Sequence, residues 1–482
     1  MKGVATLDTL QDMDSKKAFQ PKNLISIGVV VVLLVLSRVL PVPDGLNREG
    51  LTAIMIFVSA IVLWIGEAWA MSVTGLLLLF LFPWFNIMTM SECYASFGGT
   101  AFTFVLATFG LTATMCTTTI PTRICRSTVI WGGANSKRLI LALMIACGTL
   151  SAIMSNLAAT ALFISLIRPI VDAQNKHTGT KKSNLAKCLY IGIPIAANFG
   201  GFMTIAGSPS NILVVEMIEQ YSNIRVTFLG YMVVGVPFGL LSILTAWFIL
   251  TKVFKPEAVQ QNVIESFQEE RTNKTPLTTR EKKGLAIIVV TFLCWILSTW
   301  IPVLDTTVIA ILCMASLMAP GINVLTWEQY NEYSSWDVIL LCGVLPALIA
   351  GMTKHGAPDW IVKSLFGGLA GLSPFITVLL CSLIFALLRN VIPTAIAFIS
   401  FMTIPIFGMV ETLSLNVVAM MMIVTFWSMV ILILPFDPIY MLGYGDGYFT
   451  AKDTARSGAL TTVVLVVLSA VLIPLLVRLA GY

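Results

Sequence analysis

Two short polar segments interrupt the long apolar runs of this 482-residue chain, and their side chains have the chemistry to bind an anion. The first segment, "SNLAATALF", begins at Ser155 and carries Asn156 and Thr160. Polar groups buried at membrane depth cost roughly 2–7 kcal/mol each when they lack partners, so these side chains need something to bind. A helix that begins at Asn156 also directs unpaired N–H groups and the positive end of its dipole toward that ligand. We expect a carboxylate or a similar anion there.

The second segment, "RNVIPTAIAF", begins at Arg389 and repeats the first. Asn156 recurs as Asn390 and Thr160 recurs as Thr394, in both cases 234 residues further along the chain. Two tips of this kind that face each other would hold a molecule with a carboxylate at each end. The repeat therefore predicts one ligand site built from both halves of the chain.

A proline interrupts a further apolar run in each half. Pro209 lies in "GSPSN" and Pro438 lies in "FDPIY", 229 residues later. Carbonyl groups freed at such breaks can hold a small cation. Each half thus has a hairpin tip followed by a broken helix, and an odd number of spans per half gives the two copies opposite topology. Inverted repeats with broken helices are the architecture of secondary transporters.

The amino-acid composition indicates a membrane protein and excludes several other classes of protein. Hydrophobic residues make up 57% of the chain and charged residues 11%, which predicts a polytopic membrane protein. The net charge is +5, but the sequence contains no run of basic residues interleaved with aromatic residues. Nucleic acid is therefore excluded as a partner. Only two histidines and nine scattered cysteines without a CxxC pair occur. We therefore expect no metal centre, no cofactor and no enzyme activity.

The apolar runs predict an all-α membrane protein with 11 transmembrane helices and two re-entrant helical hairpins. The hairpins are the blocks 138–171 and 373–407, which are too long for one crossing and are broken at "SN" and "RNVIP". The predicted spans centre on residues 24–40, 51–66, 70–86, 101–120, 186–221, 228–251, 284–300, 305–319, 336–353, 417–444 and 457–480.

Charged segments divide the chain and suggest its orientation. The segments 172–187 and 252–283 are rich in lysine and arginine, so both should face the cytoplasm. With an inside N-terminus, 11 crossings put the C-terminus outside. The predicted parts are a cytoplasmic N-terminal segment (1–23), a first half (24–251) with hairpin 138–171 and broken helix 186–221, a cytoplasmic linker (252–283), and a second half (284–482) with hairpin 373–407 and broken helix 417–444.

Several motifs resemble one family when they are taken in order. "SNLAAT", "IAGSPSNILV" and "WDVILLCGVLPALIAGMTKHGAPDWI" are similar to segments of the divalent-anion/sodium symporter family, which includes INDY-type dicarboxylate transporters and bacterial exchangers. The likeness extends over residues 24–482. It implies a homodimer in the lipid bilayer, with an elevator motion of a transport part. It also implies C4 to C6 di- or tricarboxylates of the succinate, malate, fumarate, 2-oxoglutarate, tartrate or citrate class. We expect the protein in a plasma membrane, namely a bacterial inner membrane.

The motifs and their repeat give a set of candidate site residues. Leu157 and Val391 stand where the family usually has threonine. The expected substrate-binding residues are Ser155, Asn156, Leu157, Thr160, Ser208, Pro209 and Asn211 in the first half, and Arg389, Asn390, Val391, Thr394, Asp437 and Pro438 in the second. The expected residues of a residual sodium site are Ser151, Ser155, Asn156 and Gly207.

The second half departs from the family at the ion site. The position that corresponds to Ser151 is Phe385, and a permanent guanidinium stands at Arg389. These residues leave no cage of oxygens for sodium, and the arginine could balance the charge of a substrate. This pattern favours sodium-independent exchange of one dicarboxylate for another. The alternatives are sodium symport through the first-half site, and an Arg389 that pairs with an acid such as Asp437 and never meets substrate.

Other classes of transport protein fit the sequence less well. An ion channel needs a continuous polar pore, whereas the polar residues here converge on two tips. A carrier of arsenite or of another small inorganic anion shares the hairpin architecture. The quoted motifs argue against such a carrier only moderately.

Overall fold

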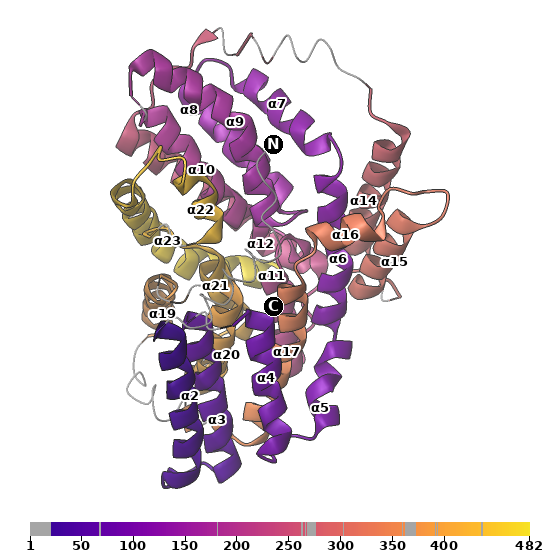
Figure 1. Cartoon of the computed structure of the whole chain (residues 1–482), viewed down its shortest axis with the longest axis vertical. Coiled ribbons are helices and arrows are strands. Elements are labelled where there is room, and N and C mark those ends of the chain that lie inside the picture. The colour runs from indigo at the N-terminus through magenta and orange to yellow at the C-terminus, as the bar shows by residue number, and fades with distance from the viewer. Residues whose placement is uncertain are drawn as a thin grey trace. The chain divides into compact units, whose positions relative to one another are not determined.

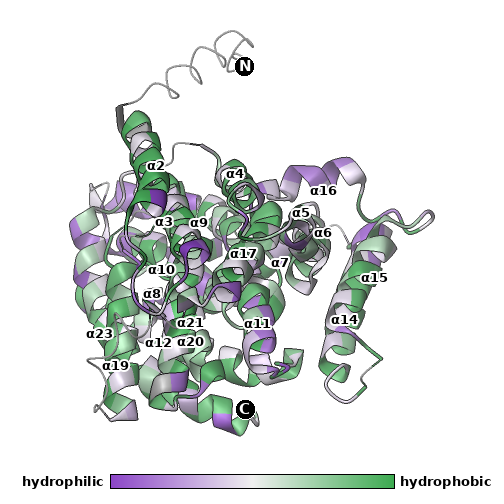
Figure 2. Ribbon diagram, turned by 90° about the horizontal axis from the view of Figure 1, so that it is seen from below, coloured by the Kyte–Doolittle hydropathy of each residue, from purple (hydrophilic) through white to green (hydrophobic). Residues whose placement is uncertain are grey.

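All regular elements in the described part of the chain are helices (Figure 1). The computed structural model describes residues 21–66, 69–180, 182–261, 264, 265, 267, 276–301, 303–358, 360, 361, 373–390, 392, 394–434 and 437–482. Hydrophobic residues cover most of these helices (Figure 2). The 1–23 segment, the 252–283 linker, and Val391 lie wholly or partly outside the described residues.

The described chain divides into two compact units. The first unit contains α2 (Pro21–Val39), α3 (Arg48–Gly66), α4 (Met71–Trp84), α5 (Met90–Ala95), the 3-10 turn η1 (Ser96–Gly98) and α17 (Trp336–Lys354). Within it, α2 packs on α3, and α4 packs on α17. The hydroxyl of Ser72 on α4 donates to the carboxylate of Asp337 on α17, and Lys354 pairs with Glu92 at 2.7 Å.

The second unit contains the remaining elements, while α6 (Thr100–Cys116) and α20 (Ala395–Leu413) have residues in both units. Its other elements are α7 (Ile120–Gly132), α8 (Ser136–Ser151), α9 (Asn156–Thr178), α10 (Asn184–Gly201), η2 (Ile205–Gly207), α11 (Pro209–Ser222), α12 (Phe228–Phe254), α14 (Thr279–Leu297), α15 (Thr306–Met318), α16 (Trp327–Tyr333), α19 (Pro374–Leu388), α21 (Val417–Met429), α22 (Pro438–Tyr444) and α23 (Ala451–Leu479).

The core of the second unit surrounds α10 and α21. Almost every residue of α10 and every residue of α21 is buried, as expected for helices that are apolar on all sides. The ring of Phe199 on α10 stacks on Phe426 of α21 with centroids 5.6 Å apart. A Cβ added to Gly200 would lie 2.0 Å from the carbonyl oxygen of Gly148, so glycine lets α8 and α10 meet backbone to backbone.

Both predicted hairpin blocks contain a break between two helices. In the first block α8 ends at Ser151 and α9 begins at Asn156, and the two helices pack against each other. In the second block α19 ends at Leu388 and α20 begins at Ala395. The re-entrant path of these blocks stays a prediction.

Both predicted broken helices are also interrupted in the structure. The run 186–221 consists of α10 and α11, separated by the turn that contains η2. The run 417–444 contains α21 and α22, and the backbone is extended at Val430, directly after α21. In both cases a proline is the first residue of the second helix, where its missing N–H costs nothing.

Five helical segments among the described residues are long and apolar enough to cross a membrane. They are Met90–Cys116, Asn156–Thr178, Phe228–Phe254, Trp336–Lys354 and Ala451–Leu479. Shorter apolar helices lie in other predicted spans, such as α4, α15 and α21. These helices are those of a multi-pass membrane protein, and the count of 11 spans remains a prediction.

Candidate functional site

The break between α8 and α9 gathers polar atoms inside the second unit. The hydroxyl of Ser151 donates to Asn156 Oδ1 over 2.8 Å, and the backbone N–H of Ser155 donates to Thr112 Oγ1 over 3.2 Å. Ser155 is the N-cap of α9, but its side chain makes no capping hydrogen bond to that helix. The first N–H groups of α9 are therefore not satisfied by their own cap, which leaves this helix end suited to an anion.

The break between α10 and α11 is held together by Asn211. Its Nδ2 donates to the carbonyl oxygens of Gly201 and Thr204 over 2.7 and 2.6 Å, which fixes the orientation of the amide. Asn211 Oδ1 is buried and has no hydrogen-bond partner among the described residues. Thr204 Oγ1 donates in turn to the carbonyl of Ala152, in the turn after α8, over 2.6 Å. The two breaks of the first half thus form one connected polar cluster.

The amide of Asn156 is closely packed against α8 and α10. Its Nδ2 donates to Asn198 Oδ1 on α10 over 3.2 Å. A Cβ added to Gly201 would lie 2.3 Å from Asn156 Oδ1, so only glycine fits beside this amide. Gly207 is packed in the same way, because its Cβ would lie 2.5 Å from the carbonyl oxygen of Gly201. These two glycines allow backbone carbonyls and the Asn156 amide to approach one another closely.

Arg389 is buried in the second half and does not reach toward water. Its Nε donates to the carbonyl of Ser428, and its Nη1 donates to the carbonyl of Ile392 over 2.6 Å. Its Nη2 lies 3.8 Å from Asp437 Oδ2, and the two side chains are only 3% and 6% exposed. The ion pair between Arg389 and Asp437 is therefore present, as the alternative interpretation of this arginine requires.

Asp437 lies at the start of α22 and pairs with Arg389. Its Oδ1 accepts from the backbone N–H of Ile439 over 3.0 Å, so it caps α22. An internal carboxylate thus occupies the start of a helix beside a buried cation.

The other candidates of the second half contact their own helices. Asn390 Nδ2 donates to the carbonyl of Ala386 over 2.7 Å, while its Oδ1 is buried without a partner among the described residues. Thr394 caps α20, because its hydroxyl accepts from the N–H of Ala397 over 3.3 Å. Pro438 is the first residue of α22. The predicted residue Val391 lies outside the described residues. The ring of Phe385 packs edge-on against Phe398.

The remaining candidates of the first half differ in exposure. Thr160 is fully buried, and its hydroxyl has no partner in the part of the chain that the structure describes. Leu157 is 45% exposed, so it faces away from the buried cluster. Ser208 caps α11 by accepting from the N–H of Ser210, and Pro209 follows as the first helical residue. The orphaned oxygens of Thr160, Asn211 and Asn390 belong to residues that the sequence motifs single out.

Three polar residues of the cluster were not predicted from the sequence. Asn198 lies in the buried helix α10, Thr204 lies in the turn after it, and Thr112 lies on α6. A single asparagine inside "IAANFGG" was a usable signal for Asn198, because an amide in a fully apolar helix needs partners. Thr112 and Thr204 carry no such signal, since threonine commonly bonds to its own helix.

Comparison with known proteins identifies the family. A family model described as the sodium:sulfate symporter transmembrane region matches residues 21–479. This chain belongs to the sodium:sulfate symporter family. The resemblance to divalent-anion/sodium symporters that the motifs indicated is thereby confirmed, and the chain is a transporter and not an enzyme.

Staphylococcal members of this family are among the relatives of the chain. A sodium-dependent dicarboxylate transporter, SdcS, of Staphylococcus saprophyticus is 26% identical over 404 residues, which cover 78% of this chain and 76% of the relative. The protein of the same description from Staphylococcus aureus is 26% identical over 385 residues, which cover 76% and 74%. The two alignments extend over most of both chains.

Proposed function

We propose that this protein is a sodium-coupled symporter of dicarboxylate anions of the C4 to C6 class. Membership of the family and the description of the staphylococcal relatives support this function. They favour sodium symport over the sodium-independent exchange that the substitutions at Phe385 and Arg389 suggested. The physical reason lies in the second half: Arg389 is neutralised by Asp437, so it does not supply an uncompensated charge to the substrate.

The observation that carries the proposal is the oxygen cluster of the first half. Asn211 Oδ1 is buried, oriented by its own amide donors, and lacks a partner in the described chain. An oxygen that can only accept is satisfied by a cation or by a donor. The carbonyls of Gly201 and Thr204 lie at the same break, and hard cations such as sodium take oxygen ligands of this kind. The cluster therefore suits one sodium ion.

The substrate would bind beside this ion. The uncapped start of α9 offers N–H groups to one carboxylate, and Ser155 and Thr160 lie on its first turns. A sodium ion beside it would further stabilise the negative charge. Binding of the two is then mutually favourable, which is the thermodynamic basis of symport. We include the homodimer, the elevator motion, and the re-entrant hairpins in this proposal, on the strength of the family resemblance.

Sodium-dependent stabilisation tests the ion site directly. The unfolding temperature of the purified protein would be compared in sodium chloride and in potassium chloride of equal ionic strength. We expect stabilisation by sodium in the wild type, and its loss in Gly201→Ala, whose Cβ displaces the Asn156 amide. Gly110→Ala is the matched control, because its Cβ would meet Met314 at an ordinary 3.6 Å. Equal unfolding temperatures of the wild type in the two salts would refute the sodium site.

The proposed membrane layout has a separate test. We place the protein in a bacterial plasma membrane with segments 172–187 and 252–283 in the cytoplasm and Tyr482 outside. Single cysteines at these three places, in a background without exposed cysteines, would be labelled from either side of sealed vesicles. Labelling of Tyr482→Cys from the same side as either basic segment would overturn the count of 11 spans.

A further inference from the structure

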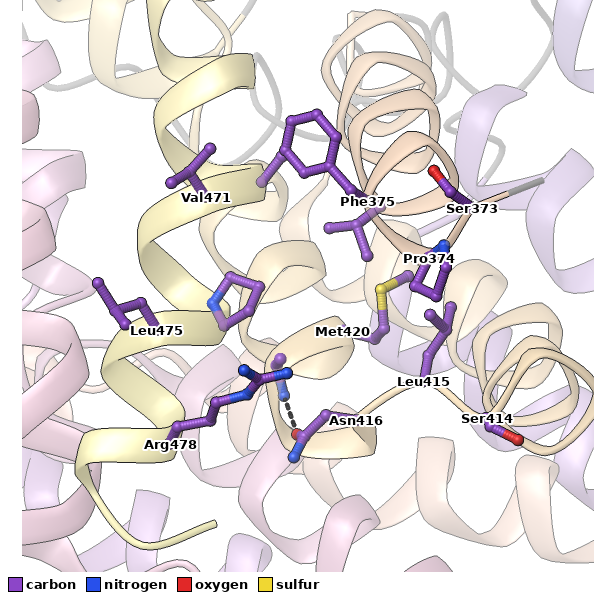
Figure 3. A pocket seen from close by; sticks show the side chains of 14 residues that line it. Ser373, Pro374, Phe375, Ser414, Leu415, Asn416, Met420, Val471, Leu475 and Arg478 are labelled. Atoms are coloured by element: carbon purple, nitrogen blue, oxygen red, sulfur yellow. Dashed lines mark hydrogen bonds between the residues drawn. The ribbon is translucent and has the colours of Figure 1, made fainter.

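A pocket of about 590 Å³ lies in the second unit (Figure 3), and none of its lining residues belongs to the polar cluster. It is lined by the beginnings of α19 and α21 and by the last turns of α23. Apolar side chains form one part of its wall, among them Phe375, Met420, Val471 and Leu475. Arg478 and Asn416 lie together at another part of the wall (Figure 3). The pocket is therefore amphipathic.

The apolar part of the pocket continues onto an exposed apolar face. Phe375 is 52% exposed, Val471 is 45% exposed and Leu475 is 51% exposed. Further large apolar residues are exposed along the same two helices: Ile376, Leu380, Leu383, Ile384 and Leu387 on α19, and Leu460, Val463, Val464 and Val467 on α23. In a multi-pass membrane protein such a face is solvated by lipid acyl chains. The pocket thus opens onto the region where acyl chains are available.

The polar part of the pocket favours negative charge. Arg478 lies in the last turn of α23 and its side chain extends toward Asn416 (Figure 3). Among the described residues no carboxylate forms an ion pair with it. Asn416 is the N-cap of α21 and Ser373 is the N-cap of α19, so the positive ends of two helix dipoles lie at the wall of this pocket.

Two other pockets of the second unit lack this combination. The pocket between Met115 and Phe292 is lined almost entirely by apolar side chains. The pocket beside Trp131 contains Arg123, but the Nε of this arginine donates to Thr119 Oγ1 over 2.8 Å. Of these three pockets, only the one at Arg478 joins an apolar groove to an arginine side chain that has neither an ion pair nor a hydrogen bond among the described residues.

We propose that this pocket binds an anionic membrane phospholipid, with the phosphate at Arg478 and an acyl chain along Phe375, Val471 and Leu475. Charge complementarity with the unpaired arginine selects an anionic headgroup, because a cation near the membrane surface attracts anionic lipid. The apolar groove selects a lipid over a free phosphate. This inference does not depend on the proposed transport function.

Native mass spectrometry of the purified full chain tests the proposal. The protein would be exchanged into detergent with equal amounts of phosphatidylglycerol and phosphatidylcholine, and retained lipid would be counted per protomer. We expect preferential retention of one phosphatidylglycerol. In Arg478→Gln its retention should fall about fivefold, as expected for loss of one cation at the membrane surface. Val471→Trp, which fills the groove and keeps the arginine, should lower it as well.

Lysine 252 provides a control of equal charge. Lys252 is also exposed in the last turn of a long helix, α12, but does not line this pocket. Lys252→Gln should retain phosphatidylglycerol like the wild type. Equal retention of the two lipids by the wild type would show that the pocket does not prefer an anionic headgroup. If soluble glycerophosphoglycerol, which has no acyl chains, displaced the lipid at matched concentration, the claim that the groove binds an acyl chain would be wrong.

Discussion

Arg389 and Asp437 should stabilise the fold only as a pair. Their charged groups lie 3.8 Å apart and are almost completely buried. At an effective dielectric constant of about 20, two unit charges at this distance attract by about 4 kcal/mol. Removal of one partner leaves the other charge buried and uncompensated, at a cost of roughly 3–5 kcal/mol. We therefore expect Asp437→Asn to lower the free energy of unfolding by that amount.

The double variant distinguishes a charge pair from two separate roles. In Arg389→Gln/Asp437→Asn both charges are gone, and both amides can still form hydrogen bonds to the surrounding backbone. Replacing both partners of a buried ion pair with neutral groups is often nearly neutral for stability. The double variant should thus be more stable than Asp437→Asn alone, and a double-mutant cycle should give a coupling of several kcal/mol.

Unfolding of the four proteins in detergent would be followed by circular dichroism. The control cycle uses Lys354 and Glu92, which lie 2.7 Å apart but are 46% and 42% exposed. An exposed pair of this kind should couple by less than about 1 kcal/mol. Coupling below about 0.5 kcal/mol between Arg389 and Asp437, within the scatter of independent sites, would refute the buried pair.

Further predictions concern the two predicted tips and a carboxylate in the first turn of α14. Asn156→Ala and Asn390→Ala should each weaken succinate binding about tenfold to hundredfold, since the sequence repeat predicts that each amide donates to a carboxylate of the substrate; calorimetry that finds wild-type affinity in both would contradict this. Hydrogen bonds from Thr119 lower the pKa of Glu281 to about 2 from its ordinary 4.5. The stability that Glu281 contributes is therefore complete above pH 4.5 and is lost as the pH falls toward 2. The stability difference between wild type and Glu281→Gln should shrink over that range, and a difference that does not vary with pH would contradict this.

The internal repeat made much of the fold predictable. The positions of Asn156 and Asn390 located both helix breaks, and Pro209 and Pro438 located the start of the second helix after each interruption. Such breaks can be recognised from the local sequence. Polar residues and prolines destabilise a continuous apolar helix, so their presence in an apolar run indicates an interruption. The amphipathic helix α7 was not predicted. It lies between the predicted span 101–120 and the predicted hairpin block 138–171, and its arginines lower its hydropathy.

The contacts of the site were less predictable than its elements. The sequence allowed Arg389 either to face the substrate or to pair with Asp437, and only the fold brings Asp437 to 3.8 Å from it. Asn198 was missed because its role depends on the packing of α10 against both breaks. Side-chain partners that are distant in the chain are set by tertiary structure, which a local pattern does not specify.

Uptake into sealed proteoliposomes tests the central claim, which is sodium-coupled transport of a dicarboxylate. Empty vesicles would receive labelled succinate with an inward sodium gradient, and matched vesicles would receive it in potassium. A second pair would be loaded with unlabelled succinate. The account predicts rapid uptake into the empty vesicles in sodium and little uptake in potassium. Rapid uptake in potassium that requires internal succinate would contradict it and show that the protein is a sodium-independent exchanger.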